Sequence, residues 1–160
     1  MSQMQLPQPK QVYQERALRA FTDGRNCAQA VLEAFCEECR ITKEQASAIA
    51  LGFGGGMGRM REVCGTVTGG ILVLNLYYSS QSESPEMKKQ QYARVQQLMK
   101  AFAAQNGSYI CATLLGLPGA QPPTPAPRTD AYYQKRPCAQ LCADAAGIVY
   151  DIIMGASPAV

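Results

Sequence analysis

The chain has 160 residues, of which 47% are apolar and 17% are charged. This length and composition predict a single folded domain over residues 1–160 and exclude an intrinsically disordered chain. The net charge of +3 is small and there is no dense run of Lys or Arg, so nucleic acid is not expected as a partner. No signal peptide is recognisable, and the longest apolar stretch, residues 71–78, is too short to span a bilayer. With seven cysteines, we therefore expect a cytoplasmic protein in which thiols or bound metal are favoured over structural disulfides.

Apolar residues recur with a helical period along nearly the whole chain, and evidence for strands is thin. The sequence therefore predicts an all-α fold, a compact domain of six or seven helices. In chain order, the expected helices cover about residues 12–22, 27–39, 43–52, 64–78, 85–105, 109–115 and 137–154. The helix that begins near residue 64 is apolar on all sides, which indicates that it is the central one.

Several residues mark where these helices begin and where loops interrupt them. Asn26, Thr42 and Ser84 are good N-caps, and Ser84 is followed by proline and an acidic residue. Residues 52–63 contain too many glycines for a regular element, and residues 117–130 contain five prolines. We expect both segments to be loops, the second extended over the surface.

Four cysteines stand at predicted helix starts: Cys27, Cys64, Cys111 and Cys138. A helix start offers unpaired N–H groups and the positive end of the macrodipole, which both favour a thiolate over a thiol. Thiolates bind metals and attack disulfides. Four such residues on four separate segments would suit one shared site, and we expect their sulfurs to converge.

The same residues carry a resemblance to a known family. The stretches NCAQAVLEAF, GFGGGMGRMREVCGTVTGGILVL, a cysteine before LLG, and CAQLCADAAGIV are similar to the C_GCAxxG_C_C family, whose members are described as redox-active. The pattern matches Cys27, Cys64 with Gly65 and Gly69, Cys111 and Cys138, although Thr66 stands where the family has alanine. The resemblance covers roughly residues 13–153.

This resemblance implies a metal cofactor. The family is similar to a domain of split-Soret cytochrome c, which pairs haem with an iron–sulfur site. The chain has no histidine and no Cys-x-x-Cys-His, so covalent c-type haem is excluded. The implied function is electron transfer or redox sensing through an iron–sulfur cluster, favoured as [2Fe–2S], held by the four cysteines. No catalysed reaction is implied, and the redox partner is not identified.

Three alternatives stay open on the sequence alone. The first is a cluster-free thiol/disulfide redox protein, the second a zinc site, and the third a helical interaction module with inert core cysteines. Cys36 and Cys39 lie late in their helix, where the macrodipole disfavours a thiolate, so we expect them to be dispensable. Cys142 lies one helical turn from Cys138, so it is an additional candidate thiol that would share that face.

The glycine segment and its arginines form a second set of candidates. It lacks the Gly-Lys-Ser/Thr ending of a P-loop and follows a helix, so it is not expected to bind a nucleotide. We expect its backbone N–H groups to face an anionic cluster or a small anion, assisted by Arg59 and Arg61; the alternative is that the glycines only permit close packing. The contacting residues predicted here are Gly56, Gly58, Arg59, Gly65 and Gly69. The pairs Tyr77-Tyr78 and Tyr132-Tyr133 are expected to serve packing or an interface, which leaves a homodimer open.

Overall fold

A computed structural model describes residues 5–79 and 83–155 of the chain and confirms the all-α prediction. Within these residues the backbone pairs in β fashion only at an isolated antiparallel bridge between Val63 and Ile110. The elements in chain order are α1 (Lys10–Thr22), α2 (Cys27–Ala34), α3 (Lys43–Ala50), the 3₁₀ turn η1 (Leu51–Phe53), α4 (Gly54–Met57), α5 (Gly65–Tyr77), α6 (Pro85–Asn106), α7 (Cys111–Leu115), α8 (Asp130–Lys135) and α9 (Cys138–Ile153).

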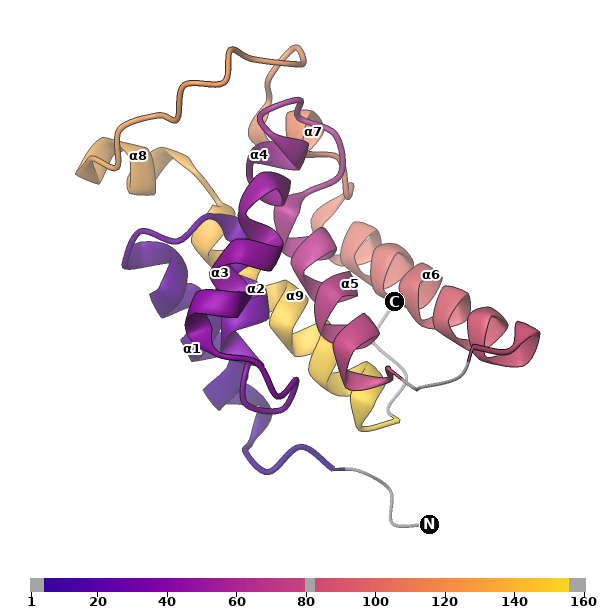
Figure 1. Cartoon of the computed structure of the whole chain (residues 1–160). Coiled ribbons are helices and arrows are strands. Elements are labelled where there is room, and N and C mark those ends of the chain that lie inside the picture. Colours follow the sequence, from indigo (N-terminus) through magenta and orange to yellow (C-terminus); the bar gives the residue numbers. More distant parts are fainter. Residues whose placement is uncertain (1–4, 80–82, 156–160) are drawn as a thin grey trace.

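The helices α1, α2, α5 and α9 form the centre of the fold. α1 packs against α2 and α9, and α5 packs against α2, α6 and α9 (Figure 1). Tyr13 of α1 stacks on Phe35 after α2 with ring centroids 4.6 Å apart. Both side chains are fully buried, so this pair anchors the core between the first two helices.

The helix starts follow the capping residues read from the sequence. Asn26 and Thr42 each form a capping box, accepting from Gln29 N and Gln45 N respectively. Ser84 accepts a hydrogen bond from the backbone N–H of Met87. These side chains satisfy N–H groups that a helix start leaves unpaired, so the beginnings of α2, α3 and α6 are fixed locally.

Glycines in α5 allow this helix to lie close to its neighbours. A Cβ on Gly69 would lie 2.7 Å from the carbonyl oxygen of Ala28, and one on Gly70 would lie 2.9 Å from Leu98 Cδ2. For Gly69 the structure therefore shows close packing of α5 on α2. The prediction of a central helix is also confirmed, because α5 contacts α2, α6 and α9.

Several elements depart in detail from the expectation, and the first is α4, a short helix within the glycine segment that was expected to be a loop. The helix expected to run to about residue 52 ends at Ala50 and continues as the turn η1. The short helix α8 was not predicted; Thr129 caps it by accepting from Tyr132 N, and it follows the proline-rich segment. In the part of the chain that the structure describes, no helix has the length and apolarity needed to cross a membrane.

Candidate functional site

Each of the four cysteines expected at a helix start is found at one. α2, α7 and α9 begin at Cys27, Cys111 and Cys138, and Cys64 is the N-cap of α5. All four line one cavity of about 50 Å³. The remaining lining residues are Phe21, Asn26, Gly55, Arg61, Thr66, Leu114, Leu115, Arg128, Tyr132, Arg136 and Leu141. Four helix starts therefore open on a single small space.

Backbone pairing places Cys64 beside Cys111. The Cys64 N–H donates to Tyr109 O at 2.8 Å, and the Cys111 N–H donates to Glu62 O at 2.6 Å. These bonds flank the antiparallel bridge between Val63 and Ile110. Two short segments that are far apart in sequence are thus held in register, and each delivers one cysteine to the cavity.

Two glycines leave room for the cysteines. A Cβ on Gly65 would overlap the Sγ atom of Cys27 and would lie 3.0 Å from Phe53 O. A Cβ on Gly56 would lie 2.6 Å from the Cβ atom of Cys111. The absence of side chains at Gly65 and Gly56 therefore leaves room for Cys27 and Cys111.

The glycine segment has an unusual backbone. Five consecutive residues have positive φ: Gly55 at 69°, Gly56 at 66°, Met57 at 68°, Gly58 at 58° and Arg59 at 68°. α4 therefore contains left-handed backbone, which costs a non-glycine residue roughly 1–2 kcal/mol. Such strain persists only where surrounding contacts hold it, and it is concentrated at functional sites.

The left-handed turn brings backbone donors to the site. Its end is closed by hydrogen bonds from Arg61 N–H to Gly55 O at 3.2 Å and from Glu62 N–H to Gly56 O at 2.9 Å. In this position Gly55 makes a backbone hydrogen bond to the Cys27 sulfur that favours its thiolate form. Of this turn, Gly55 is thus the residue whose backbone acts on a site thiol.

Arg61 is the arginine of this segment that enters the cavity. Its side chain is buried, with the residue 5% exposed, and its Nη1 donates to Cys111 Sγ at 3.5 Å. Its Nε and Nη2 donate to Gln121 Oε1 at 3.0 and 2.6 Å. Among the described residues, no carboxylate forms an ion pair with it. A buried guanidinium therefore faces a cysteine and a neutral amide.

Two further arginines line the cavity from the segment before α9. Arg128 donates to Phe21 O at 3.2 Å and to Arg25 O at 3.0 Å, and its guanidinium lies 4.8 Å from the Tyr132 ring centroid. Arg136 lies 4.9 Å from the same ring. The sequence analysis missed both arginines, although Arg136 stands two residues before Cys138. Tyr132 was expected to serve packing or an interface. Its ring does pack against Phe21, and it also lines the cavity.

Burial controls the ionisation of three of these thiols, Cys27, Cys64 and Cys138. It raises the pKa of Cys27, which the charge of Cys111 raises further. It raises the pKa of Cys64 to about 12, with Cys27 adding to the effect, and that of Cys138 to about 12, against the lowering effect of Arg136. The helix starts were expected to favour thiolates, but at Cys27, Cys64 and Cys138 desolvation outweighs that effect. Without a bound cation these three thiols are neutral at pH 7.

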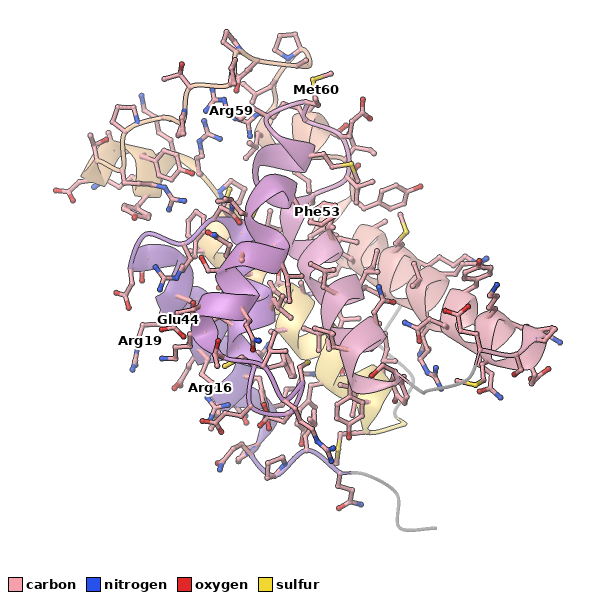
Figure 2. All side chains as sticks on the ribbon, in the orientation of Figure 1. Arg16, Arg19, Glu44, Phe53, Arg59 and Met60 are labelled. Carbon is pink, nitrogen blue, oxygen red and sulfur yellow. The ribbon has the colours of Figure 1, made fainter. Side chains whose placement is uncertain are left out.

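Several other predicted residues lie away from the cavity. Arg59 donates through Nε to Pro122 O at 2.8 Å, and Figure 2 shows it at the end of the molecule that carries the glycine segment. Gly58 is exposed, and the nearest atom to a Cβ built on it would be Gly52 O at 3.9 Å. Cys142 is buried beside the site, with Sγ 3.9 Å from Cys27 O, and does not line the cavity. Of the predicted contacts, Gly56 and Gly65 adjoin the cysteines.

Cys36 and Cys39 lie elsewhere in the fold. They were expected late in a helix, but α2 ends at Ala34 and both lie in the turns that follow it. Both are buried, and the Cys39 thiol donates to Val73 O at 3.7 Å. Neither lines the cavity with the other cysteines. Burial raises the pKa of both thiols, as do nearby glutamates. Their surroundings are those of packed core cysteines.

The described residues contain no group of three or more Cys, Asp or Glu side chains placed to hold a metal ion. A tetrahedral zinc site needs four sulfurs about 2.3 Å from one ion. The described residues therefore show no ready-made metal site, either for zinc or for an iron–sulfur cluster.

The comparisons with known proteins agree with the geometry. A profile of the family described as "Putative redox-active protein (C_GCAxxG_C_C)" matches residues 25–152. The chain belongs to the C_GCAxxG_C_C family. No curated protein and no solved structure matches it. All four cysteines of the C_GCAxxG_C_C pattern in this chain fall within the matched residues and line the cavity.

Proposed function

We propose that this protein transfers electrons or senses redox state through an iron–sulfur cluster, favoured as [2Fe–2S], held by Cys27, Cys64, Cys111 and Cys138. The proposal rests on the family's redox description and on the site itself. Four thiolates are the usual ligand set of such clusters, and the cluster would supply one-electron chemistry that no side chain here provides. The chain's residues would bind it, cover it and balance its charge.

The observation that carries the proposal is the charge of Arg61. A buried cation without a counter-charge is costly, and the group that Arg61 faces is the sulfur of Cys111. Thiolates bound to iron would supply the missing negative charge. Arg128 and Arg136, at the same cavity and without ion pairs among the described residues, would balance it further.

The raised pKa values favour bound metal over thiol exchange. A thiol oxidoreductase needs an accessible cysteine with a lowered pKa, whereas burial raises the pKa of Cys64 and Cys138 to about 12. Metal binding displaces the thiol protons and so produces thiolates at neutral pH despite burial. The cluster-free alternative is accordingly the weaker one.

The test compares cysteine variants after anaerobic reconstitution with iron and sulfide. We expect the parent and a Cys36→Ser, Cys39→Ser double variant to show the same visible absorption and the same electron paramagnetic resonance signal after reduction. The Cys64→Ser variant should show neither. Equal spectra in the parent and the Cys64 variant would refute the assignment, and loss in the double variant alone would move the ligands to the region after α2.

A further inference from the structure

The segment between α7 and α8, residues 116–129, crosses the site end of the molecule. We name it the strap. It contains five prolines, which keep it extended and remove backbone donors. Figure 1 shows it running from α7 past α4 to α8. Such a segment has little hydrogen bonding of its own, so its position depends on contacts with the rest of the fold.

Gln121 provides the main contact at the α7 side of the strap. Its Oε1 accepts from Arg61 through two nitrogens and from Arg59 Nη2 at 3.2 Å. Its backbone N–H donates to Arg59 O at 3.0 Å. One side-chain oxygen therefore joins the strap to both arginines of the glycine segment.

The contact with Gln121 matters because the same Arg61 guanidinium also donates to Cys111. The guanidinium is planar and rigid, so the two nitrogens that donate to Gln121 fix the direction of the third, which donates to Cys111 Sγ. The Nη2 to Oε1 distance of 2.6 Å is the shortest of these contacts, whereas Nη1 lies 3.5 Å from the sulfur. Gln121 is thus better placed than Cys111 to determine where the guanidinium lies.

We propose that Gln121 is a positioning residue for the four-cysteine site: it holds the Arg61 guanidinium against Cys111, so the reduction potential of the site depends on a seated strap. This inference rests on the proposed function. A positive donor at a ligand sulfur stabilises the more negative, reduced state and raises the potential. Loss of the Gln121 side chain frees two N–H groups of Arg61, which then turns away from the sulfur to find other acceptors.

The first experiment measures the midpoint potential of the reconstituted protein for the parent, Gln121→Ala and Gln134→Ala. Gln134 is an exposed glutamine of α8 and serves as the matched control. We expect Gln121→Ala to lower the ratio of reduced to oxidised protein about threefold to tenfold at a fixed potential, a negative shift of about 28 to 59 mV for one electron. The control should match the parent. A Gln121→Ala potential equal to that of the parent would overturn the proposal.

A second comparison separates positioning from a general effect on the fold. In an Arg61→Gln background, Gln121→Ala should cause no further shift, because the residue through which it acts is gone. An undiminished shift in that background would show that Gln121 acts by another route and would also overturn the proposal.

A third readout does not need a cluster. In metal-free, reduced protein, Gln121→Ala should speed trypsin cleavage after Arg128 and Lys135, and alkylation of Cys111, whereas Gln134→Ala should leave both rates unchanged. If the parent takes up no iron, the proposed function fails while these rates still test Gln121. Rates equal to those of the parent would overturn the positioning role whatever the metal content.

Discussion

Gly65 and Gly69 of α5 are four residues apart, and they face different parts of α2: Gly65 a cysteine thiol and Gly69 the backbone. A Cβ at Gly65 would overlap Cys27 Sγ, whereas one at Gly69 would lie 2.7 Å from Ala28 O and 3.0 Å from Val31 Cβ. A thiol at the end of a side chain can rotate away, but the backbone of α2 cannot. Alanine at the two positions should therefore separate metal binding from stability.

The expected magnitudes follow from opposing effects. Overpacking in a buried site costs about 1–3 kcal/mol, and replacing a helical glycine by alanine returns about 1 kcal/mol. We expect Gly69→Ala to lower the free energy of unfolding by about 2 kcal/mol, since α5 must move away from α2. Gly65→Ala should cost about 1 kcal/mol or less, because rotation of Cys27 relieves its closest contact, although Phe53 O at 3.0 Å remains.

For iron content, Gly65→Ala should be the more damaging of the two variants. The Gly65→Ala variant should lose most of its iron, because Cys27 is displaced from the cavity, whereas Gly69→Ala should keep it. The assays are urea unfolding of the metal-free proteins and iron content after anaerobic reconstitution. Full iron content in Gly65→Ala, together with a stability loss as large as that of Gly69→Ala, would refute the role given to Gly65.

Three further predictions follow from the same contacts. Arg61→Met should leave the metal-free protein at least as stable as the parent, because it removes a buried unpaired charge. The same variant should lose iron to a chelator faster than the parent, and unchanged iron retention would contradict the charge argument. Cys138→Ser should lose iron and Cys142→Ser should keep it, since only Cys138 lines the cavity, and the reverse result would exchange the two ligands. Burial raises the pKa of Cys39 to about 12, above the value of about 8.5 in an unfolded chain. The neutral thiol therefore stabilises the fold fully below about pH 8.5, and this stabilisation is lost as the pH rises towards 12. Over that range the unfolding free energy of metal-free Cys39→Ala should fall less steeply than that of the parent. Parallel curves for the two proteins would count against the raised pKa of Cys39.

The sequence predicted most of the fold because its signals are local. The capping residues Asn26, Thr42 and Ser84 lie where the structure begins α2, α3 and α6, and the apolar residues around α5 identified a central helix. The helix α8 was missed because it is only six residues long and buries no side chain, so it leaves no apolar period. Its cap, Thr129 before Asp130, was the available signal.

For the site, the sequence predicted that four cysteines open helices, and the structure places all four at one cavity. It did not predict which arginine faces them, since Arg59 and Arg61 look alike in the sequence and are separated only by the path of the left-handed turn that ends at Arg59. Arg128, Arg136 and Gln121 were missed because they reach the site through long-range contacts of the strap, which no local pattern encodes. The thiol pKa values depend on burial, which is a property of the folded chain.

The central claim is that the four cysteines hold an iron–sulfur cluster, and quantitative analysis of iron and acid-labile sulfide in protein purified without oxygen tests it most directly. We predict about two irons and two sulfides per chain, the content of one [2Fe–2S] cluster. Protein that contains neither element, both as purified and after reconstitution, with all seven thiols free to react once unfolded, would contradict the claim.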